Sequence, residues 1–177
     1  MCSSDLDELG SRVVAARLVR EMMHLAFLLE RDLKGPGVTN ADVIYATHSV
    51  LPCFEIVDSR IRDWRIRLQD TVADNASSGM FVLGDRAVDL KGLDLSTCGM
   101  VLEKNGAIEC TGVGAAALGS PVNCVAWLAN ALGRYGITLA AGEIILSGSL
   151  GALIPVVAGD SLNLSIGGIG SAAIRFT

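Results

Sequence analysis

The sequence predicts a strand-rich α+β domain with about two helices. Half of its 177 residues are hydrophobic (51%) and its mean hydropathy is +0.49, a composition that disordered chains do not have. Twenty glycines divide the chain into short apolar runs, several of which alternate with period two as strands do. Two segments carry helix signals, and the length suits one domain with a single buried core.

The first third of the chain is expected to hold one apolar element, one turn and one helix. The spacing of the hydrophobic residues within residues 7–31 fits either a helix or a buried strand. A turn follows at Lys34-Gly35-Pro36-Gly37. Thr39 and Asp42 then suit the cap and first turn of a helix that runs to about Val50 and ends before a proline.

The middle of the chain predicts three short strands around a polar turn. Residues 53–57 form an apolar run, and residues 64–68 alternate with period two, which is typical of a strand with one solvent face. Residues 70–79 are rich in turn-forming side chains, and a short strand at residues 80–83 follows them.

A hairpin and two regions of strand are predicted for the remainder. Asn105-Gly106 between the apolar runs 100–103 and 107–110 indicates a tight β-hairpin. One strand is expected at residues 143–150, and two or three more are expected within residues 156–176.

The clearest helix begins after the hairpin. Ser120 suits its cap and Pro121 its first turn, and Gly133 and Gly136 lie near its end. Its apolar face consists of Val122, Val125, Ala126, Ala129 and Leu132.

Composition also limits the partners and the compartment. A net charge of −5 and a pI near 4.9 argue against a nucleic-acid surface, which needs clustered Lys and Arg. The most apolar window, residues 137–158, is broken by Glu143 and Pro155 and is too interrupted for a membrane helix. The start is polar and acidic, unlike a signal peptide, and the five cysteines form no C-x-x-C pair. We therefore expect a cytoplasmic protein with free thiols.

Two segments carry the polar residues most typical of a functional site. Glu55 lies inside an apolar run, where a buried carboxylate needs a cation or hydrogen-bond donors. A hard divalent metal would meet that need, and so would one of the arginines nearby. Asp74, Asn75 and Ser77 crowd the polar segment that follows. They suit either a capped turn or a set of donors and a proton carrier beside a metal.

Other polar or glycine-rich stretches favour structural interpretations. Residues 58–70 mix both signs of charge at alternating positions and indicate a solvated strand face or a subunit contact. Gly112 and Gly114 lack the spacing of a dinucleotide-binding loop. His48 falls late in a predicted helix, where it would face solvent, and His24 lies among methionines, where packing is the simpler role.

Several separated stretches together resemble the family of 2-hydroxypenta-2,4-dienoate (2-oxopent-4-enoate) hydratase and 4-oxalocrotonate decarboxylase. The matching stretches are Leu51-Pro52 with Glu55-Ile56-Val57-Asp58-Ser59-Arg60-Ile61, Asp70-Thr71-Val72-Ala73-Asp74-Asn75-Ala76-Ser77-Ser78-Gly79, Gly119-Ser120-Pro121-Val122-Asn123 with Trp127-Leu128-Ala129, and Ala141-Gly142-Glu143-Ile144-Ile145-Leu146-Ser147-Gly148-Ser149-Leu150-Gly151. The resemblance covers about residue 25 to the C-terminus. It implies the mixed β-roll or sandwich of the fumarylacetoacetase C-terminal domain, with a catalytic domain at residues 25–177.

The resemblance implies a metal-dependent hydro-lyase of aromatic-compound degradation. Mg²⁺ or Mn²⁺ holds the 1-carboxylate and 2-oxygen of the dienol and stabilises charge on that oxygen as a Lewis acid. The dienol ketonises, and water adds to the conjugated alkene to give 4-hydroxy-2-oxopentanoate. Three stretches look more like the hydratase, namely Arg62-Asp63-Trp64, Val122-Asn123 and Ser149-Leu150-Gly151, and the decarboxylase is the alternative. Because the family is oligomeric, we expect a homo-oligomer or a complex with a homologous hydratase or decarboxylase.

The resemblance also assigns candidate site residues. Glu55 matches one metal-ligating glutamate of the family. The candidate catalytic residues are Asp74, Asn75 and Ser77. The candidate substrate-binding residues are Ser77, Ser147, Gly148 and Ser149, of which the last three match a loop that closes the pocket.

Two departures from the family bear on activity. Its other two metal ligands come from a Glu-x-Glu strand, and Met22 and His24 stand at those positions here. A thioether is a poor Mg²⁺ ligand, and imidazole favours softer ions. The family's N-terminal region, with a lysine that assists proton transfer, has no match here, so we expect residues 1–24 to be a doubtful segment from a truncated gene. The chain is then a weak enzyme, or a non-catalytic subunit that pairs with an active homologue.

Overall fold

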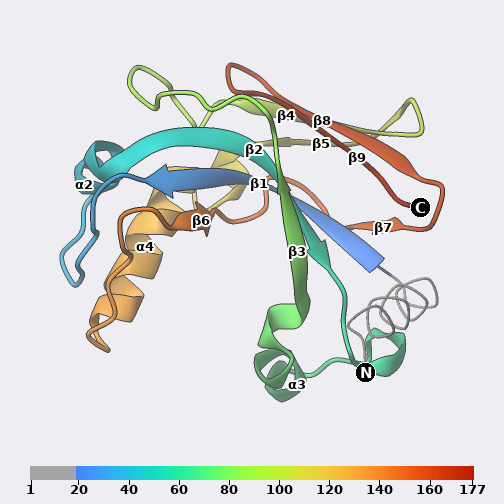
Figure 1. Ribbon diagram of the computed structural model, residues 1–177, viewed down its shortest axis with the longest axis horizontal. Coiled ribbons are helices and arrows are strands. Elements are labelled where there is room, and N and C mark those ends of the chain that lie inside the picture. The colour runs from blue at the N-terminus through green and yellow to red at the C-terminus, as the bar shows by residue number, and fades with distance from the viewer. Residues whose placement is uncertain (1–18) are drawn as a thin grey trace, which may run out of the picture.

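Two antiparallel sheets make up most of the structure, a computed structural model that describes residues 19–177 (Figure 1). The five-stranded sheet has the order β3-β2-β1-β6, and β7 also pairs with β1. Its strands are β1 (Val19–Leu29), β2 (Thr47–Val57), β3 (Ser78–Leu83), β6 (Ile144–Leu146) and β7 (Ile154–Val156).

The four-stranded sheet has the order β5-β4-β8-β9. Its strands are β4 (Gly99–Lys104), β5 (Ala107–Val113), β8 (Ser161–Ile166) and β9 (Gly170–Arg175). The predicted strand-rich α+β class is confirmed.

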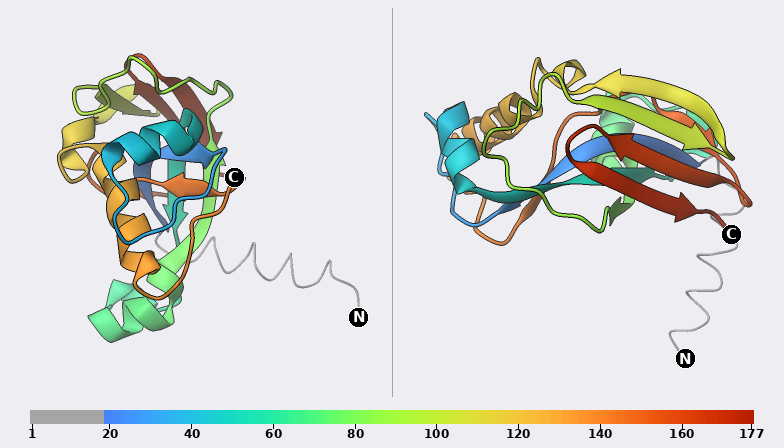
Figure 2. Two further views of the ribbon diagram at one scale, coloured as in Figure 1. Left: turned by 90° about the vertical axis from the view of Figure 1, so that its left-hand side faces the viewer. Right: turned by 90° about the horizontal axis from the view of Figure 1, so that it is seen from above.

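Within residues 19–177, three helices and three 3₁₀ turns connect the strands. The helices are α2 (Asn40–Ala46), α3 (Leu68–Ala73) and α4 (Pro121–Gly133), and the turns are η1 (Arg62–Trp64), η2 (Asn75–Ser77) and η3 (Gly114–Ala116). Helices α2 and α4 contact each other at the end of the sheets away from the C-terminus (Figures 1 and 2).

The core fills the space between the two sheets. Figure 2 shows the four-stranded sheet lying over the central strands of the other sheet. Strand β8 alternates strictly, with Leu162, Leu164 and Ile166 buried and the residues between them exposed. Strand β1 is buried continuously from Met23 to Phe27, so it is covered on both faces. The central position of β1 and β2 therefore brings polar side chains such as His24 and Ser49 inside the protein.

Residues 7–31 were expected to form either a helix or a strand, and residues 19–29 form strand β1. Residues 7–18 lie outside the described part of the chain. The expected boundary after residue 24 falls inside this strand, which pairs with β2 from Arg20 to Leu29. Residues 19–24 are therefore part of the main sheet.

The helix predicted up to Val50 was too long. Thr39 and Asp42 form the expected capping box, but α2 ends at Ala46, and β2 begins at Thr47. Pairing of β2 with β1 along its whole length outweighs the local helix signal. His48, predicted to lie on the helix, is an exposed residue of β2.

The strand predicted at residues 64–68 is wrong. The alternation there reflects exposed charges, and the backbone forms η1 and then α3, which has no buried residue and exposes Leu68 and Val72. The first residues of the predicted 70–79 turn accordingly lie in α3. Strand β3 begins at Ser78, two residues before the strand that was predicted at residues 80–83. The strand predicted at residues 143–150 shrinks to β6, because a turn-rich segment replaces its second half.

The remaining predictions agree with the structure, with one exception. Asn105 and Gly106 have φ of 53° and 83°, as the two central residues of a hairpin turn require. Pro121 occupies the first turn of α4, whose face of Val122, Val125, Ala126 and Ala129 is buried. Ser120 precedes α4 in extended conformation but makes no side-chain capping bond, contrary to the prediction.

One segment, residues 114–133, is long and apolar enough to cross a membrane by those two criteria alone. In the fold it divides into η3, a connecting turn and α4. With 13 residues, α4 is about 20 Å long, shorter than the roughly 30 Å apolar layer of a bilayer. Its buried face makes it a core helix.

Candidate functional site

A close contact between a histidine and a glutamate joins the two central strands. The Nε2 atom of His24 on β1 lies 3.0 Å from Oε2 of Glu55 on β2, and their side chains are 5% and 19% exposed. The register places Glu55 opposite Met22 and His24 opposite Cys53. The neighbour of Glu55 is therefore a histidine and not one of the arginines at residues 60–67, and a metal-binding role of Glu55 stays a prediction.

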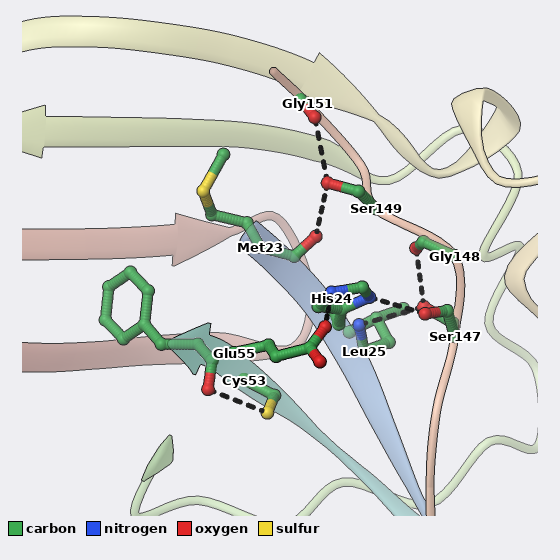
Figure 3. Close-up of polar contacts among 10 residues, drawn as sticks. Met23, His24, Leu25, Cys53, Glu55, Ser147, Gly148, Ser149 and Gly151 are labelled. Atoms are coloured by element: carbon green, nitrogen blue, oxygen red, sulfur yellow. Dashed lines mark hydrogen bonds and ion pairs between the residues drawn. The ribbon is translucent and has the colours of Figure 1, made fainter. Parts of the chain in front are cut away.

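The orientation of His24 is fixed from the far side of its ring. Nδ1–H donates to the backbone carbonyl of Ser147 (Figure 3). Nε2 makes no hydrogen bond and faces the Glu55 carboxylate. The 3.0 Å contact is thus close without the alignment of a hydrogen bond.

The segment after β6 is tied to β1 by its serine side chains (Figure 3). Ser147 Oγ accepts a hydrogen bond from Leu25 N at 3.1 Å and donates to the carbonyl of Gly148 at 3.0 Å. Ser149 Oγ donates to the carbonyl of Gly151 at 2.8 Å. These hydroxyls hold the loop in place beside His24. Their contact with substrate, and that of Gly148, stays a prediction.

This segment also lines a pocket of about 340 Å³. It is lined by Ala116, Ala117, Leu118, Cys124, Trp127, Leu128, Leu146, Ser147, Gly148 and Ser149. The lining contains no lysine, arginine, histidine, aspartate or glutamate, and Cys124 is its ionisable side chain. The pocket suits an apolar group, and Ser147 both lines it and contacts His24.

Asp74 forms a second polar cluster with groups on both sides of it in sequence. Its carboxylate accepts hydrogen bonds from Ser77 Oγ at 2.7 Å, Arg60 Nη1 at 3.0 Å, Arg60 N at 3.1 Å and Ser59 Oγ at 3.2 Å. The bonds from Ser77 and Arg60 lower the pKa of Asp74 to about 2. Asp74 is therefore ionised at neutral pH and has the partners of a positioning residue.

The turn held by Asp74 has an unusual backbone. Asn75, Ala76 and Ser77 all have positive φ, at 52°, 56° and 57°, a region that costs non-glycine residues free energy. The carbonyl of Ser77 accepts a hydrogen bond from Asp58 N at 2.9 Å, which attaches the turn to the end of β2 three residues beyond Glu55. That separation corresponds to about 10 Å along a strand. Asp74 and Ser77 are brought together, and the catalytic roles assigned to them and to Asn75 stay predictions.

Ionised carboxylates at Asp74 and Asp160 make the fold sensitive to acid. The bonds from Asn105 and Lys104 lower the pKa of Asp160 to about 2, below the value of about 3.9 in an unfolded chain. The stability that such a carboxylate contributes is complete above pH 4 and is lost as the pH falls toward 2. We expect the unfolding temperature to drop over this range and to drop less in Asp160→Asn. Asp89→Asn removes an exposed carboxylate and should leave the profile unchanged. An identical profile for Asp160→Asn would contradict this assignment.

Cys53, beside the pair, is not a nucleophile. Burial, together with the charge of Glu55, raises the pKa of the Cys53 thiol to about 12. The thiol donates to the carbonyl of Phe54 at 3.4 Å. The site therefore offers no thiolate at neutral pH.

The donor set does not fit Mg²⁺. Mg²⁺ prefers six oxygen ligands in octahedral geometry, and carboxylates usually supply the protein's share. Within residues 19–177, no three His, Cys, Asp or Glu side chains are grouped to hold a metal. At the position in question there is one carboxylate, and an imidazole nitrogen faces it.

Sequence reasoning missed the contacts of three residues. The residues are His24, Ser59 and Arg60. His24 contacts Ser147, 123 residues away, and no local pattern reveals such a distance. Arg60 and Ser59 lie 14 and 15 residues from Asp74, although the mixed charges of residues 58–70 did indicate unusual density of polar groups.

The two stacked sheets, the carboxylate on β2 and the serine loop define a known class of domain. The chain matches the family described as Fumarylacetoacetate (FAA) hydrolase C-terminal over residues 10–177, and it belongs to that family. A solved structure of 4-oxalocrotonate decarboxylase from Pseudomonas putida G7, complexed with magnesium and adipate, superposes with a TM-score of 0.86 and 39% identity. The match covers 90% of this chain and 61% of that one.

Among curated proteins, hydratases are similar at higher identity. A 2-hydroxypent-2,4-dienoate hydratase of Pseudomonas putida is 70% identical over 113 residues, which is 64% of this chain and 51% of the relative. A 2-hydroxyhexa-2,4-dienoate hydratase of Comamonas testosteroni is 55% identical over 153 residues, 86% of this chain and 58% of the relative. The chain thus spans between half and three-fifths of the length of these two relatives.

Proposed function

We propose that this chain is the catalytic domain of a hydro-lyase that adds water to 2-hydroxypenta-2,4-dienoate, giving 4-hydroxy-2-oxopentanoate. The observation that carries the proposal is the 70% identity to a named hydratase, compared with 39% to the decarboxylase. A role in the degradation of aromatic compounds and a cytoplasmic location follow from the same relationship.

The pocket beside the serine loop supports the hydratase over the decarboxylase. The hydratase substrate ends in an uncharged alkene, whereas 2-oxohex-3-enedioate ends in a second carboxylate. The pocket wall offers no lysine or arginine to such a carboxylate. Burying a carboxylate without a partner is costly, so the pocket favours the uncharged substrate.

In this proposal the chain's own residues position the substrate and limit access of water. Asp74 holds Ser77 in its left-handed turn, and Ser77 contacts the substrate as the resemblance implies. The loop of Ser147, Gly148 and Ser149 lies beside the substrate and closes the pocket, as the resemblance implies. Glu55 lies beside the acidic end and would be one ligand of a divalent ion of the family's kind, Mg²⁺ or Mn²⁺. Because His24 stands where the family has a carboxylate, the chain would hold that ion less tightly.

An assay of both reactions tests the proposal. The conjugated dienol absorbs ultraviolet light, so its loss and the appearance of 4-hydroxy-2-oxopentanoate measure hydration, and CO₂ release from 2-oxohex-3-enedioate measures decarboxylation. We expect slow hydration in Mg²⁺ or Mn²⁺ and no CO₂ release. Decarboxylation faster than hydration, or no hydration even after glutamates are restored at positions 22 and 24, would overturn the proposal.

The His24–Glu55 contact favours one second candidate, a non-catalytic subunit. His24 stands at a position where the family has a metal-ligating glutamate, and its ring lies 3.0 Å from the Glu55 carboxylate. Exposed apolar side chains at Leu68, Val72, Met80 and Phe81 suit contacts with a copy of the chain or with an active homologue. Co-purification of a stable hetero-oligomer, together with absent activity of the isolated chain, would support this candidate.

A further inference from the structure

The pocket beside the serine loop is larger than the alkene end of the proposed substrate needs. Its volume is about 340 Å³, whereas an apolar cavity of about 150 Å³ is enough to hold a benzene molecule. The unsubstituted dienoate would place no more than its terminal alkene carbons there, since its carboxylate lies beside Glu55 in the proposed function. Such a small group would leave much of the apolar wall without contacts. The pocket therefore has room for several further carbon atoms.

The wall of the pocket is connected to the Glu55 carboxylate by a short chain of contacts. Ser147 lines the pocket, and its carbonyl oxygen contacts Nδ1 of His24. On the opposite side of the same ring, Nε2 lies 3.0 Å from Oε2 of Glu55. One imidazole ring and one carbonyl group thus connect the carboxylate with the wall. A substrate that lies beside Glu55 consequently needs only a short substituent to reach the pocket.

The mouth of the pocket presents two large apolar side chains to water. Leu118 is 62% exposed and Trp127 is 64% exposed. Leu118 also has a φ of 51°, in the left-handed region that costs a leucine free energy. Asn123 Nδ2 donates to the carbonyl of Leu118 at 2.8 Å and so holds this turn. An alkyl chain that covers both side chains would remove apolar surface from water, which favours binding.

We propose that the pocket binds an alkyl substituent at the far end of the dienoate, and that Leu118 and Trp127 select its length. This inference rests on the proposed hydratase function and specifies its substrate class. The preferred substrates are 2-hydroxy-2,4-dienoates that carry an unbranched alkyl chain on their terminal alkene carbon. A charged group at that position is rejected, because the described lining offers it no lysine or arginine.

A series of saturated 2-oxo acids tests the pocket without any turnover. These acids keep the acidic end of the substrate but lack the alkene that takes up water. The chain has two tryptophans, so Trp64→Phe leaves Trp127 as the single fluorescent reporter at the mouth. From 2-oxopentanoate to 2-oxooctanoate in Mg²⁺, we expect each added methylene to tighten binding about two- to fourfold. The emission of Trp127 should move to shorter wavelength as water leaves its surface.

Substitutions at the exposed mouth change the length dependence without disturbing the core. Leu118→Ala should reduce the gain in affinity for each methylene. Ala116→Leu adds an apolar side chain to the lining, and it should weaken 2-oxooctanoate roughly tenfold because the longer chain is then overpacked. The shorter 2-oxopentanoate should be nearly unaffected. Ile108→Ala is the control, since Ile108 is 68% exposed on β5 and lies outside the lining.

Two results would overturn the inference. The first is an affinity that does not change with chain length, which includes no binding at any length, and the second is the same length dependence in Ala116→Leu as in the wild type. Comparing kcat/KM for the hydration of 2-hydroxypenta-2,4-dienoate and 2-hydroxyocta-2,4-dienoate separates this inference from the proposed function. Equal hydration of both substrates would contradict the substituent site and leave the hydratase in place. Length-dependent binding without hydration of either substrate would do the reverse.

Discussion

Glutamate at both positions 22 and 24 is expected to raise the affinity of the chain for Mg²⁺ by roughly tenfold or more, because two carboxylates would join Glu55. His24 lies within 3.0 Å of Glu55, and the backbone of Met22 is the register partner of Glu55. Calorimetric titration with Mg²⁺ measures the change. Oxalate, a mimic of the chelating end of a 2-oxo acid, should strengthen binding further.

The same double variant should be less stable than the wild type when no metal is added. Removing His24 leaves the Ser147 carbonyl without its donor, and this lost hydrogen bond costs about 1–3 kcal/mol. The added carboxylates would also repel Glu55. Mg²⁺ should reverse the loss. His48→Glu adds a carboxylate at an exposed site of β2 and serves as the control. If the double variant binds Mg²⁺ no better than this control does, the site has been placed wrongly.

Replacement of Gly112 by alanine is expected to destabilise the fold by about 2–3 kcal/mol. A Cβ at this position of β5 would lie 2.0 Å from the backbone oxygen of Leu150 and 2.8 Å from its carbonyl carbon. Leu150 is 1% exposed, and its N–H donates to the carbonyl of Met23 at 2.8 Å. The clash therefore cannot be relieved by rotating a side chain, and it should displace the loop that contacts His24.

Gly99→Ala is the matched control for this effect. Gly99 begins the neighbouring strand β4, and a Cβ there meets no atom within 4 Å. Urea unfolding should give a stability equal to or slightly above that of the wild type for Gly99→Ala, because alanine restricts the unfolded chain. Equal stabilities for the two variants would show that the Leu150 backbone yields without cost.

The regular elements with strong local signals could be predicted from the sequence, and the environment of the site could not. The turn at Asn105-Gly106 and the start of α4 at Pro121 follow from residue types that few other conformations accept. The helix ending at Ala46 was misjudged, because pairing of β2 with β1 depends on a strand that is distant in sequence. The segment containing α3 was misjudged because exposed charges can alternate in any conformation.

For the site, residue types indicated Glu55 and the Asp74 segment, but the partners came from elsewhere in the chain. Ser59 and Arg60 approach Asp74 only because the chain reverses between β2 and β3. His24 is oriented by Ser147, which lies beyond β6. Such contacts depend on the packed fold and leave no pattern in the neighbouring residues.

Ser147 connects the His24 ring with the apolar pocket. Its carbonyl orients the His24 ring, and the same residue forms part of the wall of the apolar pocket. A molecule that presses on this wall would tilt the imidazole, and a change in what the imidazole binds would reshape the wall. Binding in the pocket and ion binding beside Glu55 would then be thermodynamically linked, and each is expected to alter the affinity of the other by the same factor.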